Sequence, residues 1–200
     1  TGRDCVVEAR SQLVGRIKPG RYGAGETPQV TLSEVRGRQI VQAAGWPDTF
    51  YAISRRIAAA AGGTVPGTFG IAAVADTVTA IWAGAERLWF TADDPTLMSR
   101  FDGKFTDEDA VFLDISDSRA VLRVTGLKAR NVLAKGIAVD LHTSIFPVQA
   151  IAHTMVEHAG VLVHRVGPEA FELYVPRSYA VNLWHWLTES AAEFGYGVEE

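Results

Sequence analysis

A faint internal repeat constrains the fold of this chain more than any other feature of its sequence. When the sequence is shifted by 81 positions, TLSEVRGRQIVQAAG (31–45) aligns without a gap with FLDISDSRAVLRVTG (112–126). A further slip of two residues aligns a second group of positions. The matched pairs are Leu32 with Leu113, Arg38 with Arg119, Gly45 with Gly126, Pro66 with Pro147, Gly84 with Gly167 and Glu86 with Glu169. Several of them fall at turns and strand ends, where glycine and proline have backbone reasons to be retained. The repeat therefore predicts two copies of one supersecondary unit packed into a single body.

Hydrophobic spacing and turn residues predict a similar order of elements in both copies. In the first copy, a strand at 38–44 precedes a helix that Pro47 opens and Gly62 and Gly63 close. The other expected elements are strands within 69–90, a short helix after Pro95, strands at 111–115 and 119–125, a helix between Gly126 and Gly136, strands at 149–156, 161–166 and 171–175, and a helix at 178–194. The unit is β-α-β-β-β-α, or close to it. We expect a duplicated α+β fold, with a mainly antiparallel sheet and helices packed on one side.

Three segments are expected along the chain. Residues 1–30 are rich in glycine and basic residues, and they are predicted to form an extended N-terminal arm with little core of its own. Residues 31–106 are the first α+β half and residues 107–200 the second, within one compact body. The polar stretch KFTDED (104–109) marks the expected boundary between them.

Composition excludes several classes of protein. At 200 residues and 48% hydrophobic content the chain can bury a sizeable core, yet no apolar run approaches the ~18 residues of a membrane span. The net charge of −4 gives no general attraction to nucleic acid or anionic membrane. The single cysteine, Cys5, excludes an intrachain disulfide and fits a reducing compartment.

The residues offer no convincing catalytic, cofactor-binding or metal site. His153 and His158 are five apart within an expected strand, so they should point to opposite faces, where they cannot share a metal ion. The glycine-rich stretch GRYGAG (20–25) neither follows a strand nor opens a helix, so it lacks the context of a dinucleotide-binding loop. No phosphate loop and no Ser/His/Asp pattern is present.

Two segments are candidates for contact with a partner. The basic arm carries Arg16, Lys18 and Arg21 together with Tyr22, and it can bind phosphate or lie along an acidic partner, of which we favour the second. The closing helix carries Trp184 and Trp186. Either tryptophan can anchor another protein, as tryptophan often does at the centre of an interface, or both can be buried within this chain.

Longer motifs in the second half carry a resemblance to a known family. DISDSRAVLRVTGLKARNVLAKG (114–136) and HAGVLVHRVGPEAFELYVPRSYAVNLWHWL (158–187) are similar to the aminomethyltransferase (glycine-cleavage T-protein) family. The resemblance implies the folate-binding fold of that family. Where the folate enzymes carry carboxylates ahead of the last hairpin, this chain has Ala159 and Gly160, and its nearest acid is Glu157. That departure argues against folate chemistry on this chain.

A narrower resemblance covers nearly the whole chain. LVGRIKPGRYGA, DISDSRAVLRVTG and FELYVPRSYAVNLWHWLTESAAEFG resemble the gamma subunits of heterotetrameric sarcosine oxidases. The resemblance implies a cytoplasmic complex that oxidatively demethylates sarcosine to glycine, with formaldehyde or methylene-tetrahydrofolate and hydrogen peroxide as the other products. It implies alpha, beta and delta subunits as partners, the large alpha subunit most directly. FAD, FMN, NAD, tetrahydrofolate and zinc are then held by those subunits, and this chain is a structural subunit without catalytic residues.

Other functions stay open at this point. One is a gamma-like subunit of an N-methylglutamate dehydrogenase-type enzyme, and another is a stand-alone folate-dependent one-carbon transferase. A small-molecule or RNA-binding module is a third, although the basic, aromatic stripe expected of an RNA-binding surface is absent.

Overall fold

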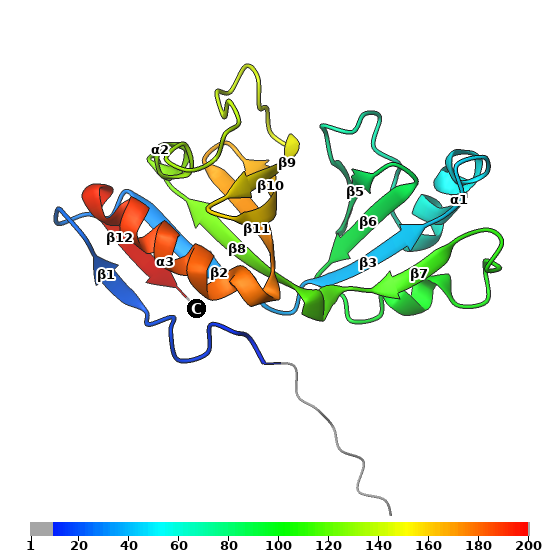
Figure 1. Cartoon of the computed structure of the whole chain (residues 1–200), viewed down its shortest axis with the longest axis horizontal. Coiled ribbons are helices and arrows are strands. Elements are labelled where there is room, and N and C mark those ends of the chain that lie inside the picture. The colour runs from blue at the N-terminus through cyan, green and yellow to red at the C-terminus, as the bar shows by residue number, and fades with distance from the viewer. Residues whose placement is uncertain (1–9, 200) are drawn as a thin grey trace, which may run out of the picture.

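The computed structural model describes residues 10–199, so Cys5 lies outside the described part of the chain. Within that part, the strands form a seven-stranded sheet of order β1-β12-β2-β8-β11-β10-β9 and a five-stranded sheet of order β4-β5-β6-β3-β7 (Figure 1). The strands are β1 Gly20–Tyr22, β2 Val30–Glu34, β3 Gln39–Ala44, β4 Ala73–Ala75, β5 Val78–Gly84, β6 Arg87–Ala92, β7 Val111–Asp114, β8 Arg119–Thr125, β9 Ile151–Val156, β10 Ala159–Gly167, β11 Ala170–Pro176 and β12 Tyr196–Glu199. The helices are α1 Phe50–Ala61, α2 Ala129–Leu133 and α3 Ala180–Ala191, with short 3₁₀ turns η1 Met98–Phe101, η2 Ser116–Ser118, η3 Arg177–Tyr179 and η4 Ala192–Phe194. No helix among these residues has the length and apolar character needed to cross a bilayer.

The predicted duplication is visible in the order of the elements. The series β2-β3-α1-β4-β5-β6-η1 is followed by β7-β8-α2-β9-β10-β11-α3. Asp76 and Glu157, 81 positions apart, both adopt positive φ angles, of 50° and 54°, in the turns β4–β5 and β9–β10. The last hairpin of each copy also carries a register shift, ending at Gly84 in one and at Gly167 in the other. The repeat therefore extends to turn geometry. Each unit starts with an additional strand, of which β7 was predicted at 111–115 and β2 was not predicted.

That additional first strand crosses to the other copy. β2 pairs antiparallel with β8 of the second unit, and β7 pairs antiparallel with β3 of the first unit. The strands therefore form two sheets, and each unit completes the sheet of its neighbour. The pairing is mainly antiparallel as predicted, with β12 and β2 as a parallel pair. The sequence boundary near residue 107 stays a prediction, and it does not coincide with the division between the two sheets.

The core lies in three layers. One cluster of buried side chains lies between the seven-stranded sheet and α2 and α3, and a second lies between the five-stranded sheet and α1. A third cluster, which includes Ile40, Ile81, Val121, Leu162 and Tyr174, joins the inner faces of the two sheets. The helices therefore cover the outer face of each sheet, while the inner faces bury each other (Figure 1).

Helix α1 illustrates how the local sequence produces this packing. Its buried positions include Phe50, Ile57 and Ala61, which recur at helical spacing and face the five-stranded sheet. Burial of a side chain such as Phe50 or Ile57 contributes about 1.5–3 kcal/mol. Gly62 ends the helix in the left-handed conformation, with φ of 81°, as the sequence predicted.

The described part of the N-terminal arm contacts the core more than the sequence indicated. Leu13 is fully buried, Ile17 is nearly so, and both belong to the cluster beneath α3. Strand β1 pairs antiparallel with β12. The expectation of an arm with little core of its own is therefore wrong for residues 10–22.

Candidate partner-binding sites

Four of the six predicted partner-contact residues line one surface depression. Arg16, Lys18, Tyr22 and Trp184 surround a hollow of about 240 Å³ beside β12. The ring of Tyr22 stacks on that of Tyr196 with 5.4 Å between centroids, and its hydroxyl donates a hydrogen bond to the Lys18 carbonyl. The arm and the closing helix, far apart in sequence, thus contribute to one surface.

The basic side chains of this surface are not neutralised within the described part of the chain. Arg16, Lys18 and Arg21 are exposed, and none of them forms an ion pair with residues 10–199. Arg21 lies on the edge strand β1. The arrangement is compatible with the predicted contact to an acidic partner, and that contact stays a prediction.

The two tryptophans of α3 have different surroundings. Trp184 is only 4% exposed and packs in the core with Leu183 and Leu187, because these positions face the sheet. It forms the floor of the depression and does not project as an anchor, which corrects that part of the prediction. Trp186 is half-buried, lies close to Gly136, and lines a separate hollow of about 410 Å³.

The structure also reveals a buried charge network that the sequence reasoning missed. Glu172, on β11, has a side chain that is 2% exposed. It accepts hydrogen bonds from Arg38 Nη1 at 3.2 Å, Arg38 Nη2 at 3.3 Å, Arg123 Nη2 at 2.5 Å and the Tyr174 hydroxyl at 2.9 Å. Arg38 Nε also donates to Asp93 at 2.7 Å. Arg38 stands between β2 and β3, so this network ties the crossing point of the two units to β11. An acidic residue in the apolar strand FELYV was the signal in the sequence that could have revealed it.

Burial and the neighbouring charges together shift the pKa values of the groups in this network. Burial alone would raise the pKa of Glu172, but Arg38, Arg123 and the Tyr174 hydroxyl together hold that pKa below its usual value. Burial and the Glu172 charge raise the pKa of Tyr174. Burial lowers the pKa of His164 to about 4, with Glu172 and Arg38 acting on it in opposite senses. At neutral pH the network therefore holds an ionised Glu172 beside a neutral His164.

The duplication gives this network a counterpart with different chemistry. Arg119 is the repeat equivalent of Arg38, and Trp89 is the equivalent of Glu172. The Arg119 guanidinium lies 5.3 Å from the centroid of the Trp89 ring, and Trp89 Nε1 donates to Gln42 Oε1 at 3.0 Å. Arg119 therefore faces an aromatic ring at the place where Arg38 meets a carboxylate.

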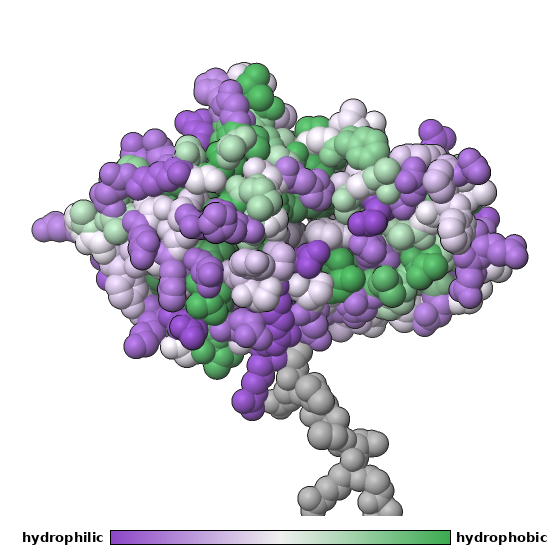
Figure 2. Space-filling model, in the orientation of Figure 1, coloured by the Kyte–Doolittle hydropathy of each residue, from purple (hydrophilic) through white to green (hydrophobic). Residues whose placement is uncertain are grey.

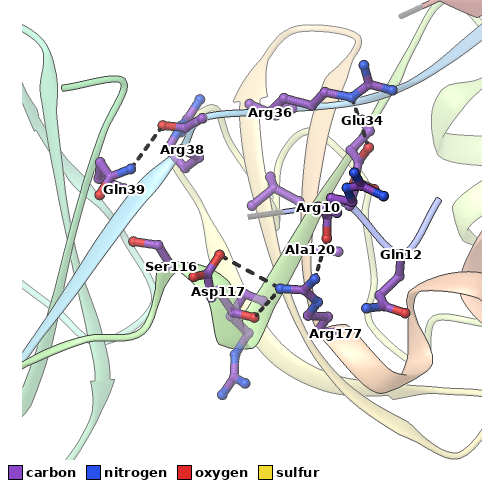
Figure 3. Close-up of a pocket in the computed structure, with 15 residues that line it drawn as sticks. Arg10, Gln12, Glu34, Arg36, Arg38, Gln39, Ser116, Asp117, Ala120 and Arg177 are labelled. Atoms are coloured by element: carbon purple, nitrogen blue, oxygen red, sulfur yellow. Dashed lines mark hydrogen bonds and ion pairs between the residues drawn. The ribbon is translucent and has the colours of Figure 1, made fainter. Parts of the chain in front are cut away.

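Arg119 also lines a pocket at the crossing point of the two units. The pocket has a volume of about 210 Å³ and is bounded by the arm and by the β2–β3 and β7–β8 connections (Figure 3). Its charged lining consists of Arg10, Glu34, Arg36, Arg38, Asp117, Arg119 and Arg177. Figure 3 shows Arg36 directed toward Glu34 and Arg177 directed toward Asp117. The N–O distances of these two ion pairs are 3.2 and 3.8 Å. The lining thus holds five arginines and two carboxylates, and Arg36, Arg38 and Arg177 are each paired with a carboxylate of this chain.

The residues considered for metal or folate binding do not converge. Among residues 10–199, no group of three or more His, Cys, Asp and Glu side chains is placed to hold a metal ion. His153 lies on β9, but His158 lies in the β9–β10 turn, so the prediction that both belong to one strand is wrong. Glu157 is exposed in the same turn.

Comparisons with known proteins agree with this architecture. The family described as GCVT N-terminal domain matches residues 72–198. The gamma subunit of sarcosine oxidase from Corynebacterium sp. (strain U-96) is 29% identical over 140 residues, which cover 69% of this chain and 68% of that protein. An aminomethyltransferase from Thermoanaerobacter sp. (strain X514) is 37% identical over 87 residues, which cover 41% of this chain and 23% of that enzyme.

Solved structures extend the similarity to the fold. The heterotetrameric sarcosine oxidase from Corynebacterium sp. U-96 contains a chain that superposes with a TM-score of 0.77 at 29% identity, covering 86% of this chain and 88% of its own. The aminomethyltransferase T of the Bartonella henselae glycine cleavage system superposes with a TM-score of 0.58 at 14% identity, covering 86% of this chain and 47% of its own. The second match shows a shared fold. The chain therefore belongs to the GCVT N-terminal domain family, and it is similar to the gamma subunits of sarcosine oxidases within that family.

Proposed function

We propose that this chain is the gamma subunit of a heterotetrameric sarcosine oxidase and that it serves as a structural subunit without catalytic residues of its own. The superposition on a chain of the Corynebacterium enzyme carries the proposal, because it extends over most of both chains at the same 29% identity. The relatives named as sarcosine oxidase gamma subunits support it independently.

The surface of the chain is suited to such a role. Large apolar side chains stand exposed in several places, including Trp46 at 60%, Leu113 at 50% and Ile145 at 64%. Figure 2 shows apolar surface over the loop between α2 and β9 and over the edge strand β7. Burial against a larger neighbour would contribute roughly 25 cal/mol for each Å² of apolar surface covered.

Under this proposal the chemistry takes place on other subunits. The complex would oxidatively demethylate sarcosine to glycine in the cytoplasm, with FAD, FMN, NAD, tetrahydrofolate and zinc held by alpha, beta and delta chains. This chain would pack most directly against the large alpha subunit.

Co-purification tests the proposal. The chain is tagged at its C-terminus and expressed in its native host, and the eluate is examined for flavin absorbance and for sarcosine-dependent hydrogen peroxide formation. We expect stoichiometric flavin-bearing polypeptides that turn over sarcosine, while a tag-only control yields neither. A chain that elutes alone, or that oxidises sarcosine when free of other proteins, would contradict the proposal. Turnover of N-methylglutamate in place of sarcosine would favour the dehydrogenase-type complex.

A folate-dependent transferase is the second candidate, favoured by the 37% identity to an aminomethyltransferase over 87 residues. Equilibrium dialysis of the isolated chain against tetrahydrofolate separates the two. Specific binding at micromolar concentration would support the transferase, and its absence together with co-purification would support the subunit.

A further inference from the structure

The two arginines related by the repeat differ in how their charge is balanced. Arg38 is held by Glu172 and Asp93, both within hydrogen-bond distance. Arg119 has no ion pair with residues 10–199, and its Nη1 reaches only the Ser118 carbonyl, at 3.2 Å. The difference arises because Trp89 occupies the repeat position of Glu172.

The surroundings of Arg119 favour an anion. The side chain is half-buried, and burial lowers its pKa with no carboxylate to compensate. The flat guanidinium is fixed over the Trp89 ring. A guanidinium held in this way keeps free N–H donors in a planar arrangement that matches a carboxylate.

Three other arginines on the pocket lining, Arg36, Arg38 and Arg177, are balanced by carboxylates of this chain. Glu34 and Asp117, the two carboxylates on the lining, are engaged by Arg36 and Arg177, so neither is left to pair with Arg119. The volume of about 210 Å³ is enough for an acidic side chain and too small for a folded element.

We infer that this pocket is a carboxylate-binding site, in which Arg119 receives an aspartate or glutamate side chain from a neighbouring subunit. The inference rests on the proposed function, which supplies the neighbour. Trp89 occupies the place that Glu172 holds at Arg38, so the incoming carboxylate pairs with Arg119 from the pocket. The partner thereby supplies the ion pair that Arg119 lacks among residues 10–199. The charge that Arg119 leaves unbalanced among residues 10–199 is the feature that an acidic partner surface would complement.

The test compares binding of the flavin-bearing polypeptides by full-length variants of this chain. Arg119→Gln removes the charge and Arg119→Lys keeps it. Arg55→Gln is the matched control, because Arg55 is an exposed residue of α1 that forms no ion pair with residues 10–199. We expect Arg119→Gln to raise the dissociation constant by about 30-fold or more, because the variant removes one partner of a partly desolvated charge pair. Arg119→Lys should recover part of that loss, and Arg55→Gln should bind like the wild type. Binding of the wild type should also weaken more steeply with added sodium chloride than binding of Arg119→Gln.

The outcomes separate this inference from the proposed function. If the wild type binds the flavin-bearing polypeptides and Arg119→Gln binds them equally well, the inference fails and the proposed function stands. If the wild type binds none of them, both fail. Thermal unfolding of each variant excludes misfolding as the cause of weak binding. Acetate or succinate could instead bind the wild type at submillimolar concentration and not bind Arg119→Gln, while Arg119→Gln still assembles normally. That result would identify a free small carboxylate as the ligand and would overturn the partner assignment.

Discussion

The charge network at Glu172 makes a quantitative prediction about folding. Replacement of Glu172 by glutamine keeps the shape of the side chain and one acceptor oxygen but removes its charge. Arg38, whose side chain is 12% exposed, then loses its buried counterion and retains only Asp93, which is 70% exposed. Arg123 loses its carboxylate at the same time. We therefore expect Glu172→Gln to destabilise the junction between the two units.

The size of the effect follows from the contacts. Removal of one partner from a buried ion pair costs about 3–5 kcal/mol, because an uncompensated charge is left in a poorly solvated place. The amide of glutamine still accepts one hydrogen bond, and Asp93 still neutralises part of the Arg38 charge. The expected loss is therefore near the lower limit, about 3 kcal/mol, which is a large part of the 5–15 kcal/mol that stabilises a typical domain.

Urea denaturation at pH 7, followed by circular dichroism at low protein concentration, measures this loss. Asp93→Asn is the matched control, because it removes the exposed carboxylate of the same arginine and should cost less than about 1 kcal/mol. A Glu172→Gln protein within 1 kcal/mol of the wild type, or a control that loses as much as the variant, would refute the reasoning.

Two further predictions concern pH and backbone geometry. Because burial lowers the pKa of His164 to about 4, the unfolded chain binds a proton below pH ~6.5 that the folded chain does not bind. The free energy of unfolding should therefore fall by roughly 3 kcal/mol from pH 6.5 to 4. In urea titrations at several pH values, His164→Gln should reduce this fall, and an unchanged dependence of the free energy of unfolding on pH would contradict the prediction. The lowered pKa of Glu172 acts in the same direction at lower pH. Gly126 has φ of 111°, and a Cβ there would lie 2.4 Å from the Gln29 carbonyl oxygen. Gly126→Ala should therefore lower the free energy of unfolding by at least about 2 kcal/mol, measured by thermal unfolding. Gly160→Ala, with open space around the added Cβ, should lower it by less than about 1 kcal/mol, and equal losses would contradict the geometry.

Much of the local structure is encoded over short distances. The order of strands and helices, the glycine that ends α1 and the paired turns at Asp76 and Glu157 depend on residues only a few positions away. Glycine and proline act through the backbone of their own turn, so a shift of 81 residues was enough to reveal the duplication. The resemblance to gamma subunits likewise depended on contiguous motifs, and the comparisons confirm it.

The candidate sites were predicted less completely. The sequence pointed to the arm and to α3, but it could not place Trp184 beneath the surface and Trp186 nearer to it. An amphipathic helix with a wide apolar arc can turn several of its residues inward, and the sheet that it covers decides which ones. The Arg119 pocket was invisible for a similar reason, since its walls come from the arm, two connections and η3.

By itself, the sequence determined that this protein is a duplicated α+β unit with strands and turns at defined positions. Only the tertiary structure decided that β2 and β7 cross between the units, that Arg38 meets Glu172 across 134 residues, and that Arg119 meets Trp89 instead. The physical reason is that alternation along a strand defines which side chains share a face, whereas the neighbour of an edge strand is chosen by the packing of the whole chain.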